Sequence, residues 1–372
     1  MLKRTMSGGW SSATNRLCSL LAPERFARRV RLAGPSVLEI LEERTLLNGI
    51  WISTDELMQL PTSGPAWDTV LAEANTTTGL PAISNQDDKT DTTTLAKALV
   101  GVRLGDQNYI AQARANVMAA IGTEQGGETL ALGRNLAPYV IAADLVGLDP
   151  DQDTQFRAWL RQTLTEVLGD GRSLQGTHEV RPNNWGTMAG GSRAAVAAYL
   201  GDQNEMARTA QIFKGWLGDR SSYAGFKYGE LSWQADPNNP VGINPLGATK
   251  DGHSIDGALP EEMRRGGSFQ WPPVVTGYPW EALQGAVVEA EILSRAGYNA
   301  WQWQDQALLR AVQFLYTLGS GWEAVGDDEW QPWIIDAHYG THFATNPQAN
   351  QARSWDGPPG RISSRLFHQL LA

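Results

Sequence analysis

The stretch LAKALVGVRLGDQNYIAQARANVMAAI, residues 95–121, decides the fold class of this chain. Apolar side chains recur at helical spacing on both sides of Gly105-Asp106, which interrupts them. The first stripe contains Leu95, Leu99, Val102 and Leu104, and the second contains Ile110, Ala113, Val117, Ala120 and Ile121. This spacing predicts two amphipathic helices joined by a short Gly-Asp connection, which is a helical hairpin.

The same pattern continues along the chain, whereas strand-like alternation is scarce. Further helices are predicted at residues 129–146, with a kink at Pro138, and at 156–168, 192–200, 205–217, 280–296 and 304–318. We therefore predict an all-α fold of helical hairpins. No repeat of fixed period is present, which favours an α/α toroid or incomplete barrel over an α-solenoid. Residues 50–92 are predicted to be an extended or loop segment.

Residues 1–49 are expected to be a disordered targeting leader outside the fold. Four arginines, at 25, 28, 29 and 31, precede VLEILEERTLLN at residues 37–48. This resembles the short arginine-rich leader of many exported planctomycete proteins, and an amphipathic helix is the alternative. Export would make the protein secreted, periplasmic or cell-surface. Residues 50–372 are then a single domain with a loop insertion at about 218–278.

Composition restricts the partners of this protein. The net charge is −10, and residues 1–46 carry eight Lys or Arg against four Glu, so the rest of the chain is still more acidic. An acidic domain argues against nucleic acid or an anionic membrane as partner, and no apolar run is long enough for a membrane span. The single cysteine, Cys18, excludes a disulfide framework and a cysteine-built zinc site. The sequence leaves the oligomeric state open.

Two segments and one tyrosine carry the groups that an elimination next to a carboxylate requires. RPNNWG at residues 181–186 supplies the amides of Asn183 and Asn184, and DGALPEEMRRGG at residues 256–267 supplies Arg264 and Arg265. Tyr278 follows as a phenol flanked by Gly and Pro. Amides and a guanidinium can neutralise a carboxylate, while a phenol can move the proton of the neighbouring carbon.

Aromatic and basic side chains suggest how a polysaccharide would be held. Most of the fifteen tryptophans lie in the second half of the chain, several in loop-like sequence, and flat rings beside polar groups suit sugars. His253 is a further candidate base. The remaining candidates for substrate binding are Trp185, Lys89, His178, Lys227, Tyr228, Trp233, Arg264 and Trp271. The pair His338 and His342 lacks the glutamate of a zinc motif, so neither a metal nor another cofactor is expected.

The order of these motifs over residues 85–340 resembles the alginate lyase domain. The shared features are Asn-Asn-aromatic, then Asp-Gly-x-Leu-Pro-x-Glu-x-x-Arg-Gly, then Tyr and a helix ending in Ala-Glu-Ile-Leu. The resemblance implies an α/α toroid that cleaves an acidic polysaccharide such as alginate or glucuronan by β-elimination. It also implies catalytic roles for Asn183, Asn184, Arg265 and Tyr278. Trp185 stands where the family has a histidine, which leaves the base open among Tyr278, His253 and His178.

Other readings of the same residues remain. A glycoside hydrolase on the same type of toroid would pair Asp256 with Glu261, Glu262 or Asp336 across the scissile bond. A surface protein that binds acidic glycans without cleaving them is a second alternative. An α-solenoid that binds a protein partner is a third.

Overall fold

The predicted hairpins are present, and their Gly-Asp connections explain how they turn. The computed structural model describes residues 49–77, 79–343 and 345, which all belong to the unit Leu46–Ala372. Gly105 ends helix α4 (Thr90–Leu104) in the left-handed conformation, and Asp106 then accepts a hydrogen bond from the Asn108 N–H at 2.8 Å to cap α5 (Gln107–Ala119). Gly201 and Asp202 close the next such hairpin in the same way. The predicted leader and Cys18 lie outside the described residues, apart from Gly49.

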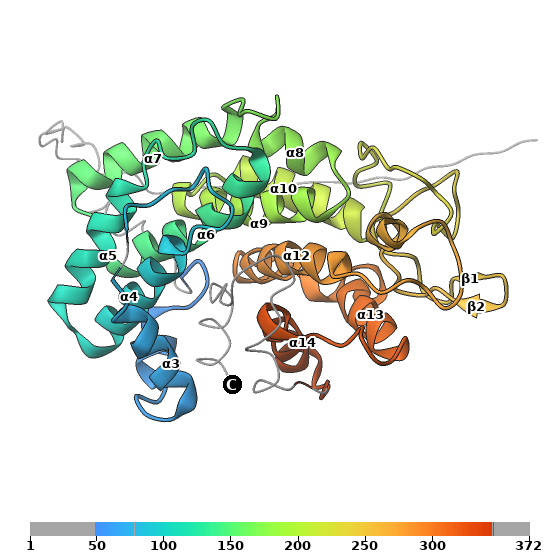
Figure 1. Ribbon diagram of the computed structural model, residues 1–372. Coiled ribbons are helices and arrows are strands. Elements are labelled where there is room, and N and C mark those ends of the chain that lie inside the picture. Colours follow the sequence, from blue (N-terminus) through green and yellow to red (C-terminus); the bar gives the residue numbers. More distant parts are fainter. Residues whose placement is uncertain (1–48, 78, 344, 346–372) are drawn as a thin grey trace, which may run out of the picture. The chain divides into compact units, whose positions relative to one another are not determined.

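The described chain is almost entirely helical, which confirms the all-α prediction (Figure 1). The remaining α-helices are α2 (Thr54–Gln59), α3 (Pro65–Ala74), α6 (Thr129–Val146), α7 (Pro150–Thr165), α8 (Leu174–Val180), α9 (Asn184–Leu200), α10 (Gln203–Leu217), α11 (Pro260–Met263), α12 (Tyr278–Arg295), α13 (Trp303–Thr317) and α14 (Trp330–Tyr339). Short 3₁₀ turns are η1 (Arg264–Gly266), η2 (Ala300–Gln302) and η3 (Gly326–Asp328). One antiparallel hairpin, β1 (Thr249–Lys250) and β2 (His253–Ser254), interrupts the predicted insertion. Closure into a toroid stays a prediction.

Residues 50–92 were expected to lack helices, and that expectation is wrong for α2 and α3. A capping box between Ser53 and Glu56 starts α2, and Pro65 is the first residue of α3. Helix α2 has six residues and buries Leu57, whereas α3 buries Trp67, Val70 and Ala74, which recur at helical spacing. The short α2 therefore gives little periodic signal, but α3 carries one that the prediction missed.

Glycines let the central helices α6, α9 and α12 approach one another closely. A Cβ atom on Gly133 of α6 would lie 2.9 Å from the Ala189 nitrogen of α9. A Cβ atom on Gly285 of α12 would lie 2.3 Å from the Met188 nitrogen. Contacts farther along the helices, such as Gly191 with Val288, advance in the same direction, so the three helices run parallel. Helix α9 lies between the other two and packs extensively against both (Figure 1).

Pro138 lies inside α6, and the hydroxyl group of Ser192 from α9 forms hydrogen bonds with two backbone groups of α6 next to it. The Ser192 hydroxyl donates to the Gly133 carbonyl at 2.8 Å and accepts from the Ala137 N–H at 3.1 Å. These two backbone groups would bond directly in an uninterrupted helix, so Ser192 is inserted into the hydrogen-bond ladder. The insertion ties α6 to α9 at the point where proline removes a donor.

Candidate active site

Glu262 lies under the N-terminal end of α9 and contacts the Asn-Asn pair. Asn183 is the N-cap residue and Asn184 begins the helix. The Asn184 N–H donates to Glu262 Oε1 at 2.6 Å. The first N–H groups of a helix have no partner within it, and a carboxyl group there also faces the positive end of the helix dipole. Glu262 therefore fixes where Asn184 begins.

Burial makes Glu262 an unusual carboxyl group. The residue is 1% exposed, and burial raises the pKa of Glu262 to about 8, although the Asn184 N–H and the Arg265 charge act in the opposite direction. At neutral pH the group is therefore mostly protonated. Among the described residues, Glu262 Oε2 and the side-chain oxygens of Asn183 and Asn184 have no hydrogen-bond partner. Three polar atoms are thus left unsatisfied around the start of α9, where a ligand could supply partners.

Arg265 and Tyr278 lie against each other beside this cluster. The Arg265 guanidinium carbon is 3.9 Å from the centroid of the Tyr278 ring. Arg265 belongs to η1 and is exposed, and Tyr278 is the half-buried first residue of α12. Because Arg265 also acts on the charge of Glu262, one set of neighbours joins Asn184, Glu262, Arg265 and Tyr278. We call these four residues the amide–phenol cluster.

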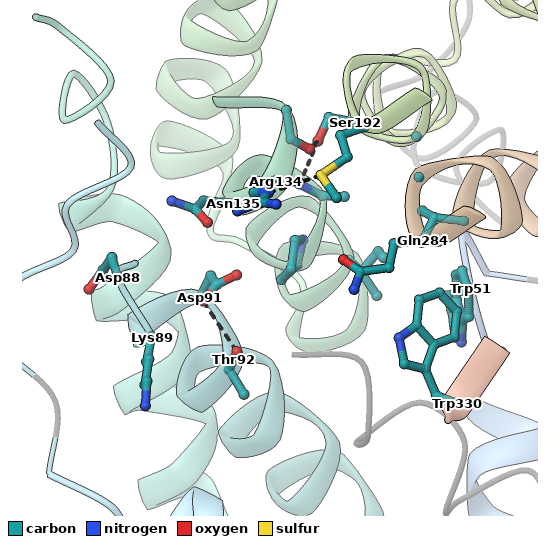
Figure 2. Close-up of a pocket in the computed structure, with 18 residues that line it drawn as sticks. Trp51, Asp88, Lys89, Asp91, Thr92, Arg134, Asn135, Ser192, Gln284 and Trp330 are labelled. Carbon is teal, nitrogen blue, oxygen red and sulfur yellow. Dashed lines mark hydrogen bonds between the residues drawn. The ribbon is translucent and has the colours of Figure 1, made fainter. Parts of the chain in front are cut away.

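A cavity lies on the inner side of the central helices (Figure 2). Asp88, Lys89, Asp91 and Thr92 line one side, Arg134 and Asn135 the middle, and Gln284, Trp51 and Trp330 the other. Lys89 is the one predicted site residue in this lining, which contains no member of the amide–phenol cluster. The start of α4 and the two tryptophans therefore contribute a wall that the sequence motifs did not indicate.

The ion pair of Arg134 with Glu281 connects the cavity to the amide–phenol cluster. Arg134 lines the cavity, and its Nε atom also donates to the sulfur of Met188 at 3.2 Å. Glu281 follows Tyr278 by one helical turn, and its charge contributes to the raised pKa of Glu262. The pair thus touches both regions, and the α12 residues that line the cavity begin about two turns along the helix from Tyr278.

His178 is in the core, so its predicted contact with substrate is wrong. It is 3% exposed, and its Nε2 atom lies 3.1 Å from Glu289 Oε1. Burial lowers the pKa of His178 far below its usual value and raises the pKa of Glu289. Burial thus favours the neutral form of both groups.

Burial corrects one further substrate-binding prediction. Trp233 is 1% exposed, donates to the Gly267 carbonyl at 3.1 Å and packs edge-on against Phe269, so it anchors the loop. Arg264 forms an ion pair with Glu261 on the preceding turn of the same helical segment, and its contact with substrate stays a prediction. Trp322 and Trp330, which lie in loop-like sequence, are also buried. A tryptophan-lined groove made from all of these residues is therefore wrong.

Other predicted residues lie nearer the surface. Trp271 is 39% exposed and stacks on His253, with ring centroids 4.5 Å apart and planes 11° apart. Trp185 is half-buried under the guanidinium of Arg181, at 4.2 Å. Lys227 is exposed, whereas burial raises the pKa of Tyr228 above its usual range. The exposed Trp271–His253 pair forms a stack of its own, outside the contacts of the amide–phenol cluster.

Two carboxylates considered for a hydrolase, Asp256 and Asp336, form ion pairs or hydrogen bonds with other groups of the domain. Asp256 pairs with Arg310 at 2.5 Å and accepts from the Gly247 N–H at 2.8 Å. Asp336 accepts from the Thr341 hydroxyl at 2.7 Å and from the Phe343 N–H.

Within residues 49–343, leaving out residue 78, no group of three or more His, Cys, Asp or Glu side chains could hold a metal ion. No described helix is both long and apolar enough to cross a bilayer.

Comparison with known families bears on the same region. A model of the alginate lyase family matches residues 109–231, which confirms the resemblance over that segment. The match indicates a polysaccharide lyase. It spans α5 to α10 and contains the Asn-Asn pair, but it ends before Glu262, Arg265 and Tyr278. No curated protein matches the chain.

Proposed function

We propose that this protein cleaves a uronic-acid polysaccharide, such as alginate or glucuronan, by β-elimination. The observation that carries the proposal is the amide–phenol cluster, in which Arg265 lies 3.9 Å from the centre of the Tyr278 ring and acts on the charge of Glu262, which accepts a hydrogen bond from the Asn184 N–H. A cation, an amide, a carboxyl group that is mostly protonated and a phenol are the groups that the chemistry requires. The family match over residues 109–231 supports the same reaction class.

Charge neutralisation is the first task of such an enzyme. The hydrogen on C5 of a uronate is weakly acidic because the adjacent carboxylate resists further negative charge. The Arg265 guanidinium and the Asn184 amide would bind that carboxylate, and the proton on Glu262 would let a third polar group approach it without repulsion. A donor aimed at developing charge is worth about 2.7–4 kcal/mol.

Tyr278 would then transfer the proton. Its phenolate oxygen takes hydrogen from C5, the C4–C5 double bond forms, and the C4–O4 bond breaks. The resulting phenol returns the proton to the glycosidic oxygen, so atoms and charge balance. Trp185 replaces the family's histidine, His178 is buried, and His253 stacks on Trp271 outside the contacts of the amide–phenol cluster, so Tyr278 is the group assigned to both steps.

The assay for this reaction is direct. Purified protein is incubated with alginate, glucuronan, pectate and unsulfated glycosaminoglycans, and absorbance of the C4–C5 double bond is recorded. New reducing ends without that absorbance would identify a hydrolase, and binding without shortening would identify a glycan-binding protein. Either result would overturn the proposal.

A polymeric substrate is too large to enter cells, which also favours the export that the leader predicts.

A further inference from the structure

We propose that the cavity beside the amide–phenol cluster binds an uncharged sugar, so that the substrate alternates uronate with neutral residues. This inference rests on the proposed elimination reaction and narrows its substrate class. The cavity and its neighbours supply the argument through their charges, their hydrogen-bonding groups and their position on α12.

The charges of the cavity do not suit a second uronate. Two carboxylates, Asp88 and Asp91, and two cations, Lys89 and Arg134, line the cavity, and a third carboxylate, Glu281, pairs with Arg134 from outside that lining. Arg134 is already paired with Glu281, and their side chains are only 8% and 16% exposed. A uronate in this space would bring a further negative charge toward Asp88 and Asp91, which costs binding free energy in a partly buried site.

The same carboxylates suit hydroxyl groups. Asp88 accepts hydrogen bonds from the Ala82 N–H at 3.0 Å and from the Thr90 hydroxyl, and Asp91 accepts from the Thr92 hydroxyl at 3.2 Å. An ionised carboxylate offers about four acceptor positions, so the partly exposed Asp88 can accept from a sugar hydroxyl, whereas Asp91 is only 3% exposed. The opposite wall is apolar, formed by Val288 and by Trp51 and Trp330, which are 2% and 4% exposed, so it offers no charge to a bound sugar (Figure 2).

The cavity is close enough to hold the sugar next to the one that reacts. Tyr278, Glu281, Gly285 and Val288 recur along one side of α12, and the last two line the cavity. At 1.5 Å per residue, Gly285 is about 10 Å along the helix from Tyr278, within reach of a neighbouring ring. A uronate bound at the cluster would therefore place its linked neighbour in the cavity.

Two classes of polymer can be cleaved by the same 1,4-elimination but differ in the charge of the sugar next to the reacting uronate. Glucuronan contains glucuronate alone, whereas hyaluronan, unsulfated chondroitin and heparosan alternate glucuronate with an N-acetylhexosamine. We expect at least one alternating polymer to exceed glucuronan in kcat/KM by about tenfold, equivalent to about 1.4 kcal/mol. Equal or faster cleavage of glucuronan or alginate would overturn the inference and leave the lyase intact. No unsaturated product from any polymer would overturn the lyase itself.

Glu281→Gln tests the role of the paired arginine. Releasing Arg134 from its partner should favour a second uronate and lower the preference for the alternating polymer by about tenfold. Both substrates are measured on one preparation, so the ratio does not depend on the folded fraction. Glu56→Gln removes the partner of Arg295 in another ion pair and should leave the ratio unchanged. An unchanged ratio in Glu281→Gln would contradict the proposed role of charge.

Discussion

The guanidinium carbon of Arg265, within η1, lies 3.9 Å from the centroid of the ring of Tyr278, which begins α12. At an exposed site such a contact contributes about 0.5–1 kcal/mol, too little to account for the conformation of the loop between them. Its consequence is geometric, because it fixes a cation and a phenol side by side next to Glu262. The predictions below separate this chemical role from structural roles elsewhere in the domain.

Arg265→Ala should lower kcat/KM on the best polymer by roughly 10²–10³, since a preorganised donor to developing charge is lost. Arg265 is exposed, so the melting temperature should change little. Steady-state kinetics and thermal unfolding check both points. Arg264→Ala is the matched control, because Arg264 pairs with Glu261, and full activity in Arg265→Ala would refute the assignment.

Tyr278→Phe should abolish elimination while polymer binding is retained. The phenyl ring keeps the packing beneath Arg265 but loses the oxygen that moves the proton. Product absorbance and isothermal titration with intact polymer provide the two measurements. Tyr109→Phe, which removes the hydroxyl bonded to Asn75, should leave turnover unchanged. Turnover by Tyr278→Phe at the wild-type rate would exclude this phenol as base.

Glu262 should make the folded state less stable as pH rises. Its folded pKa of about 8 exceeds the unfolded value, so the folded protein binds more protons between about pH 4.5 and 8. The free energy of unfolding therefore falls across that range, by at most about 1.4 kcal/mol per pH unit. Glu262→Gln keeps an acceptor for the Asn184 N–H and should flatten this slope relative to wild type. Denaturant unfolding at several pH values measures it, and parallel slopes would contradict the raised pKa.

Gly285→Ala should destabilise the domain by about 1–3 kcal/mol or more through overpacking. The added methyl group would meet the Met188 nitrogen and the Thr187 carbonyl carbon, each 2.3 Å away, so backbone must move. Gly79→Ala adds the same group where nothing lies within 4 Å and should be nearly neutral. Similar melting temperatures for the two variants would show that α9 and α12 are packed less closely than described.

Two tryptophans should respond in opposite ways to truncation. Trp233→Ala removes a buried ring that packs on Phe269 and should cost about 3–5 kcal/mol of stability. Trp271→Ala removes an exposed ring and should leave stability almost unchanged. Chemical denaturation of both variants gives the comparison. A stability loss of equal size for Trp271 would mean that its stack with His253 holds the loop together.

Local sequence predicted the helices well where many residues repeat one pattern. The helix at residues 129–146 was predicted with its observed bounds, and the helix predicted at residues 280–296 spans Tyr278–Arg295. The Gly-Asp connections can be predicted from sequence because the capping of a helix end depends on neighbouring residues alone. Helix α2 escaped prediction because a six-residue helix leaves little periodic signal, whereas the helical spacing of Trp67, Val70 and Ala74 in α3 was a signal that the prediction missed.

The candidate site was only partly predictable. Asn184, Arg265 and Tyr278 were selected by residue type and order, and the fold joins them through contacts with Glu262. Glu262 itself was considered only as half of a hydrolase pair, since nothing local reveals a carboxyl group that is 1% exposed. Trp233 was misassigned for the same reason, because loop-like sequence does not show how deeply a side chain is buried.

The sequence by itself determined the helical hairpins, their turns and the set of groups able to neutralise a uronate, because each depends on the spacing or chemistry of neighbouring residues. Only the tertiary structure decided that Glu262 becomes mostly protonated, that His178 is enclosed in the core, and that Glu281 forms an ion pair with Arg134. Those properties depend on burial and on partners far away in the chain, and both exist only once the helices have packed.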